Sequence, residues 1–163
     1  MALRFAAALI LLALSPGALA QAPTPPAVSP PAETPGPPAD RVFCMQSVAP
    51  RVADPASVPD QYRTFLGIWS DASWTPQLCA ALIVENITAD GAATITYIFG
   101  PMGSGNNKPG GVLHGTGIVK DGELQFQNAD GSQYRFKPYY SDLSGTWTAP
   151  DGKTYQSVFE KTL

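Results

Sequence analysis

The sequence is poor in the residues that build metal centres and charged binding surfaces. It has one histidine, His114, and two cysteines, and charged residues make up 14% of its 163 positions. A zinc site needs several His or Cys ligands, so we predict no metal site. Lysine and arginine are scattered singly and the formal net charge is -3, which argues against nucleic acid as a partner.

Recognisable catalytic motifs are missing as well. Ser104 lacks the Gly-x-Ser-x-Gly context of a hydrolase nucleophile, and the Gly-rich segment 100–111 lacks the Gly-Lys-Ser/Thr ending of a phosphate-binding loop. We therefore predict no catalytic residue and no cofactor. The Gly-rich segment is either a long hairpin connection or a lid over a binding site.

A long apolar run occurs only at the N-terminus. After Arg4, residues 5–14 are apolar, and Pro16, Gly17 and an Ala-Leu-Ala sequence follow. This pattern is typical of a secretory signal peptide over residues 1–20, because the run is too short to span a bilayer. We expect a periplasmic or secreted protein with no membrane span after signal cleavage.

Proline dominates the next segment, residues 21–40, which is typical of a disordered linker. The remainder, residues 41–163, has the length of one domain. Cys44 and Cys79 are the only pair available in an oxidising compartment, and we predict that they form a disulfide. Neither sulfur would then be free as a nucleophile or a metal ligand.

Four Asp-Gly pairs punctuate the C-terminal half, beginning at Asp90, Asp121, Asp130 and Asp151. Asp-Gly favours two-residue hairpin turns, whose central positions need positive φ. Between these pairs apolar and polar residues alternate, as expected for strands. The sequence predicts an all-β fold, namely an antiparallel up-and-down barrel of about eight strands preceded by a short helical turn over residues 57–63. A two-sheet sandwich is the alternative.

Several side chains are assigned to the barrel interior by this alternation. Bulky residues predicted to face inward are Leu82, Val84, Ile95, Tyr97, Phe99, Leu124, Phe126, Tyr134, Phe136 and Trp147. They are large enough to fill a small barrel, which argues against a large ligand. Trp69 and Trp147 are predicted to be structural, because buried tryptophans remove a large apolar area from water.

The candidate ligand contacts are Trp74, Tyr97, His114 and Tyr134. Trp74 lies in the polar segment 70–76, which we predict to be a loop at the barrel mouth, where an aromatic ring stacks on a ligand or tucks against the sheet. His114 is a ligand contact if its face of the strand points inward and a surface residue otherwise. Glu85, the one acid in a strongly apolar strand, presents the same two possibilities.

A short helical turn leading into Gly67-Ile68-Trp69, with up-and-down strands and a secretory signal, resembles the start of the lipocalin and calycin barrels. The sequence over about residues 65–163 is also similar to small calycin-like domains of secreted bacterial proteins. The resemblance implies that Trp69 packs across the closed end of the barrel and that a basic residue from near the last strand, here Lys161, covers it.

Three functions are compatible with these features. The first is a barrel that binds a small apolar or aromatic ligand, which predicts an interior void. The second is a non-catalytic accessory or inhibitor-like module, tethered by its Pro-rich arm, that contacts an envelope or secreted protein and has a filled interior. An enzyme ranks third. We expect a monomer in each case.

Overall fold

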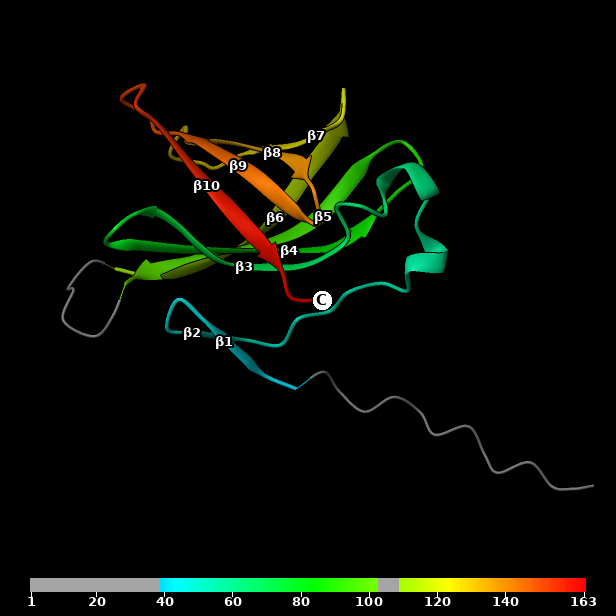
Figure 1. Ribbon diagram of the computed structural model, residues 1–163, viewed down its shortest axis with the longest axis horizontal. Coiled ribbons are helices and arrows are strands. Elements are labelled where there is room, and N and C mark those ends of the chain that lie inside the picture. The colour runs from blue at the N-terminus through cyan, green and yellow to red at the C-terminus, as the bar shows by residue number, and fades with distance from the viewer. Residues whose placement is uncertain (1–38, 103–108) are drawn as a thin grey trace, which may run out of the picture. The chain divides into compact units, whose positions relative to one another are not determined.

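Eight antiparallel strands close into a barrel in the computed structural model, which describes residues 39–102 and 109–163 (Figure 1). Each strand pairs with the next along the chain, and the last one returns to pair with the first. The strands are β3 (Gly67–Thr75), β4 (Leu78–Ile87), β5 (Ala92–Pro101), β6 (Gly111–Lys120), β7 (Glu123–Gln127), β8 (Gln133–Tyr139), β9 (Asp142–Thr148) and β10 (Thr154–Lys161). The predicted all-β, up-and-down barrel is confirmed.

Interior and exterior faces follow the predicted alternation on β7 and β8. The side chains of Leu124, Phe126, Tyr134 and Phe136 are buried, whereas the intervening residues are partly or fully exposed. All ten bulky residues that we assigned to the interior belong to, or pack against, the core cluster inside the barrel. Period-two patterning was sufficient here because these strands have one wet face.

A small hairpin that the sequence analysis missed precedes the barrel. It consists of β1 (Arg41–Phe43) and β2 (Gln46–Val48). Phe43 and Val48 pack on Ile68, Ala81, Ile83 and Ile98, which form a second apolar cluster on the outer face of β3–β5. Strands of three residues carry too little periodicity to be recognised in a sequence.

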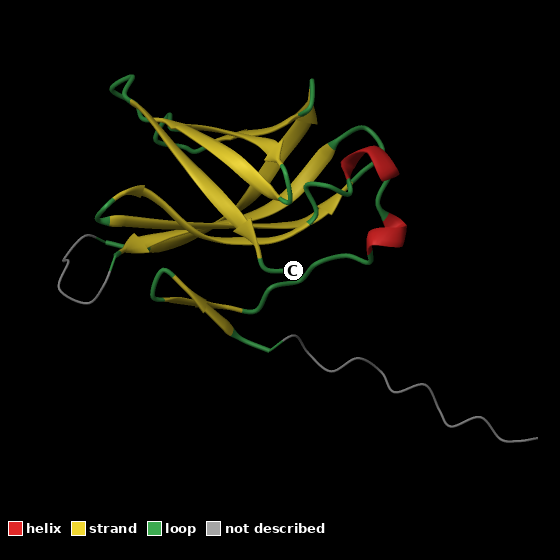
Figure 2. Ribbon diagram, in the orientation of Figure 1, coloured by secondary structure: helices red, strands yellow, loops and turns green. Residues whose placement is uncertain are grey.

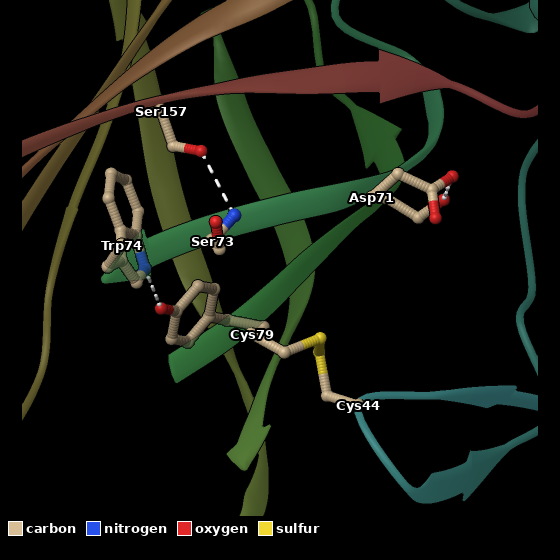
Figure 3. Close-up of a disulfide and its surroundings, with 8 residues drawn as sticks. Cys44, Asp71, Ser73, Trp74, Cys79 and Ser157 are labelled. Atoms are coloured by element: carbon tan, nitrogen blue, oxygen red, sulfur yellow. Dashed lines mark hydrogen bonds between the residues drawn. A yellow bond between two sulfur atoms is a disulfide. The ribbon is translucent and has the colours of Figure 1, made fainter. Parts of the chain in front are cut away.

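The predicted disulfide between Cys44 and Cys79 is present and links this hairpin to β4 (Figure 3). It joins residues 35 positions apart. Cys44 sits where the hairpin turns, and its carbonyl oxygen would lie 2.2 Å from a Cβ placed on Gly100 of β5. A glycine at position 100 therefore lets the hairpin approach the sheet closely.

The Asp-Gly pairs do mark hairpin turns, but only one has the predicted two-residue form. At Asp121 and Gly122 both residues have positive φ, 54° and 76°. In the other three turns only the glycine has positive φ. Each of these turns has the same pair of backbone hydrogen bonds across its loop. In the turn at Asp130, for example, Asn128 N donates to Ser132 O and Gly131 N donates to Asn128 O. These are three-residue loops in which glycine follows a tight turn.

Two short 3-10 turns, η1 (Pro55–Ser57) and η2 (Asp60–Tyr62), precede β3 and are the helical elements of the described chain (Figure 2). The helical turn predicted over residues 57–63, with Ser57 as its cap, corresponds to η2, which begins after Pro59 and has no side-chain cap. Ser57 instead ends η1, which is capped by Asp54, whose Oδ1 accepts a hydrogen bond from Ala56 N at 2.8 Å. Asp is as good a cap as Ser, and Pro55 follows it at the first position of the turn.

Trp69 closes the end of the barrel where β3 begins. Its side chain is 1% exposed and its Nε1 donates to Phe65 O at 2.9 Å. Lys161 Nζ lies 5.0 Å from the centre of the Trp69 ring. The structural role predicted for Trp69 agrees with this position, and we call this the closed end of the barrel.

The seam between β3 and β10 is short. Only two residue pairs form its ladder, and Ser157 Oγ supplements them by accepting a hydrogen bond from Ser73 N at 3.1 Å (Figure 3). At the closed end Ile68 N donates to Leu163 O at 3.0 Å. Gly67 has a φ of 130°, and a Cβ there would lie 2.1 Å from Leu163 O, so only glycine fits this position.

Several predictions fall outside the described residues. These are the signal peptide at residues 1–20, residues 21–38 of the linker, and residues 103–108 of the Gly-rich segment. Where the structure does describe the chain, it contains no helix with the length and apolar character needed to cross a membrane.

Candidate functional site

A cavity of about 780 Å³ opens at the end of the barrel opposite Trp69. Its walls come from β3–β9 and from the loop between β7 and β8. The lining residues are Trp74, Leu78, Ile95, Tyr97, Phe99, Pro109, Leu113, His114, Gly115, Thr116, Phe126, Gln127, Asn128, Ala129, Asp130, Ser132, Tyr134 and Trp147. This volume lies within the range of small-molecule sites, and most of its wall is apolar.

One of three inward-facing glycines on β6, Gly115, lines the cavity and leaves space in it. Gly111, Gly115 and Gly117 pair with Phe99, Ile95 and Ala93, whose side chains belong to the interior cluster or pack against it. A Cβ on Gly115 would have no described atom within 4 Å. The Phe99 ring occupies the space beside Gly111, and Leu124 and Phe126 occupy that beside Gly117. Opposite Ile95, by contrast, the missing side chain of Gly115 leaves space unfilled.

Trp74 and Tyr97 form the floor of the cavity. Trp74 Nε1 donates to Tyr97 Oη at 2.6 Å (Figure 3), and the two side chains are 4% and 2% exposed. The prediction that Trp74 sits in a loop is wrong, because residues 70–75 continue β3. A bulge between Trp69 and Ala72, with Asp71 at a φ of 56°, shifts the alternation by one residue and gave this segment its loop-like appearance.

Tyr134 lies beside Tyr97, with the two ring centres 4.7 Å apart. Burial is the main cause that raises the pKa of Tyr97, and the adjacent Tyr134 hydroxyl raises it further. Burial also raises the pKa of Tyr134, although hydrogen bonds with Tyr97 and Ser132 oppose the shift. Both phenols therefore remain neutral hydrogen-bonding groups at physiological pH.

Trp147 was assigned a purely structural role, but it also lines the cavity. Its ring lies nearly parallel to that of Tyr134, with centres 6.4 Å apart and planes 8° from parallel, and it stacks on Tyr155 at 4.7 Å. Its buried Nε1 has no hydrogen-bond partner in the described part of the chain. Trp147 thus belongs to the candidate site as well as to the core.

His114 borders the cavity, but its ring does not point into it. Its Nδ1 lies 2.8 Å from Thr96 Oγ1, and Thr96 faces outward between the inward-facing Ile95 and Tyr97. The Thr96 hydroxyl donates to Glu85 Oε1 at 2.7 Å, so it accepts from an Nδ1–H of His114. Of the two possibilities stated above for His114 and Glu85, the structure shows the outward-facing one for both.

Comparison with family models, with curated proteins and with solved structures found no match to this chain. Three of the four predicted ligand contacts, Trp74, Tyr97 and Tyr134, meet in one cavity.

The sequence analysis missed the glycines of β6 and the polar rim. Asn128 Nδ2 donates to Tyr134 Oη at 3.3 Å, and Asp130 accepts from Ser132 N and Oγ at 2.8 and 3.1 Å. These rim residues lie in a turn, and their composition is explained by turn geometry alone. The glycines left a readable signal, because Gly115 and Gly117 occupy the same face of one strand at a spacing of two.

Metal chemistry has no basis in the described residues. No group of three or more His, Cys, Asp or Glu side chains among residues 39–102 and 109–163 is placed to hold an ion. The chemistry that the cavity offers is apolar contact, ring stacking, hydrogen bonding to neutral donors and acceptors, and the carboxylate of Asp130 at its rim.

Proposed function

We propose that this protein is a secreted or periplasmic barrel that binds a small apolar or aromatic molecule in the cavity at its open end. The observation that carries the proposal is the unfilled volume of about 780 Å³, open at one end and lined by six aromatic side chains. A barrel with a purely structural role would be expected to fill its interior, because protein cores are close-packed. The disulfide is compatible with an oxidising compartment.

The two ends of the barrel differ in a way that supports a calycin-like, ligand-binding role. Lys161 covers the Trp69 ring at the closed end, and the cavity opens at the other end. In ligand-binding barrels of this type a sealed base and an open mouth allow a ligand to enter without unfolding any strand.

Native mass spectrometry of the full chain, gently released from the envelope of an expressing bacterium, tests the proposal. We expect an added mass of a few hundred daltons that is absent from a Gly115→Leu variant, in which the new side chain occupies the cavity. Repeated detection of the bare protein, even after incubation with neutral aromatic compounds, would contradict it.

A second candidate function, contact with another protein, rests on the β8–β9 turn. Tyr140 is 92% exposed at a φ of 54°, and its ring meets the edge of Tyr139 with centres 4.8 Å apart. Exposed tyrosines are common anchors of protein interfaces. In the same spectra a protein-sized addition that disappears in Tyr140→Ser, but not in Gly115→Leu, would favour this function.

A further inference from the structure

The charged side chains around the cavity are few and unevenly distributed among the described residues. Six aromatic side chains line it, and none of the described lining residues is lysine or arginine. The His114 ring, the remaining basic candidate, points to the outer face of the sheet. A ligand with a negative headgroup would therefore find no described cation in the wall to offset its loss of water.

Asp130 places a negative charge at the mouth. It lies in the β7–β8 loop, and both of its carboxylate oxygens accept hydrogen bonds from Ser132. It forms no ion pair with any residue that the structure describes. In the β9–β10 turn, at the same end of the barrel, Asp151 pairs instead with Lys153 at 2.7 Å. Among the described residues that line the mouth, the unbalanced charge is thus negative.

The influence of Asp130 extends to the cavity wall. Burial is the largest cause of the raised pKa of Tyr134, and the negative charge of Asp130 raises that pKa further. An ionised Tyr134 would be an anion in the wall beside the space where a ligand would lie. The field that disfavours this anion also disfavours an anionic ligand and favours a cationic one.

We propose that the cavity selects hydrophobic cations, such as quaternary or aromatic ammonium compounds, over neutral and anionic molecules of the same shape. The inference rests on the proposed function, because it specifies the charge of the ligand for the same cavity. Faces of Trp, Tyr and Phe rings attract cations, and the attraction is strongest where water is excluded. Trp74, Phe126 and Trp147 supply such rings in the same cavity that Asp130 lines.

Calorimetric titration of the full chain with three probes of similar shape tests this selection. The probes are phenyltrimethylammonium, its neutral isostere tert-butylbenzene, and the anion benzenesulfonate. We expect the cation to bind about five- to tenfold more tightly than the neutral probe, the difference that cation–π attraction provides in a partly dry site. The anion is expected to bind most weakly of the three.

Two charge-neutralising variants locate the origin of the preference. Asp130→Asn keeps an oxygen acceptor for Ser132 N and is expected to weaken cation binding about two- to threefold at low salt, with no change for the neutral probe. Asp121→Asn makes the same charge change in the β6–β7 turn at the closed end and is expected to change neither affinity.

The outcomes separate the two proposals. If tert-butylbenzene binds as tightly as the cation, or benzenesulfonate binds more tightly, the charge preference is wrong and the ligand-binding function stands. If none of the three probes binds, the ligand-binding function fails and the charge preference fails with it. An equal loss of cation affinity in Asp121→Asn would also overturn the role given to Asp130.

Discussion

Gly115 lies opposite Ile95 in the β5–β6 ladder, and the space beyond its Cα is empty of described atoms. Ile95 belongs to the interior cluster, so the face that the two residues share points into the barrel. The glycine at position 115 therefore contributes empty space to the cavity. A single substitution at Gly115 can therefore place a side chain in the cavity.

Gly115→Leu is expected to abolish binding of a neutral aromatic fluorophore such as N-phenyl-1-naphthylamine while leaving the fold intact. The new side chain enters open space, and loss of a strand glycine stabilises the folded state by about 0.5–1 kcal/mol. Fluorescence titration and thermal unfolding measure the two effects. We expect no binding and an unchanged or higher melting temperature.

Thr94→Leu is the matched control, because Thr94 is exposed on the adjacent strand and does not line the cavity. It introduces the same side chain and should leave fluorophore binding unchanged. If Gly115→Leu folds and still binds the fluorophore as tightly as the unmodified protein, the cavity is not the binding site.

Gly67→Ala is expected to destabilise the protein by more than about 2 kcal/mol. A Cβ there would collide with Leu163 O, and the φ of 130° disfavours any side chain. Gly122→Ala is the comparison, since Gly122 has positive φ but open space around it, and it should cost only about 1 kcal/mol. Chemical denaturation gives both values, and equal losses would show that the contact with Leu163 is unimportant.

Removal of the disulfide by Cys44→Ala with Cys79→Ala should lower the free energy of unfolding by about 3–4 kcal/mol, the loop-closure value for a link across 35 residues. The hairpin of residues 41–48 packs on the outer face of the sheet, so hydrogen exchange should rise there first. Fluorophore binding should survive at temperatures where the variant remains folded. Loss of binding in the folded variant would show that the hairpin helps to shape the cavity.

Stability should fall as pH rises above about 10, because burial raises the pKa of Tyr97 above its unfolded value. Above the unfolded pKa the unfolded chain releases this proton while the folded protein retains it, so unfolding is favoured by about 1.4 kcal/mol per pH unit. Below pH 10 the contribution is fully present. Urea unfolding from pH 8 to 11.5 should show a shallower decline in Tyr97→Phe, and parallel declines would contradict the assignment.

The sequence predicted the barrel because its turns and its alternation are local signals. Glycines at positions 91, 122, 131 and 152 all have positive φ, as the Asp-Gly pairs indicated. The length of each loop was not predictable from the pair alone, because three of the four turns include the residue before Asp. The hairpin of residues 41–48 was missed because its stability comes from the disulfide and from packing on β3–β5.

The candidate site was predicted less completely. Tyr97 and Tyr134 were found because alternation places them inside, whereas the bulge at Asp71 concealed that Trp74 belongs to a strand. The direction of the His114 ring depends on its contact with Thr96 across the ladder, which no pattern within β6 reveals. The void itself depends on which strands face one another, and so required the structure.

The central claim is that a small aromatic molecule occupies the barrel cavity. A crystal of the protein grown with 2-bromonaphthalene tests it most directly, because anomalous scattering locates the bromine atom independently of the protein model. We predict a single bromine peak among the rings of Trp74, Phe126 and Trp147, and none in crystals of Gly115→Leu. An empty cavity, or bromine only on the outer surface of the barrel, would contradict the claim.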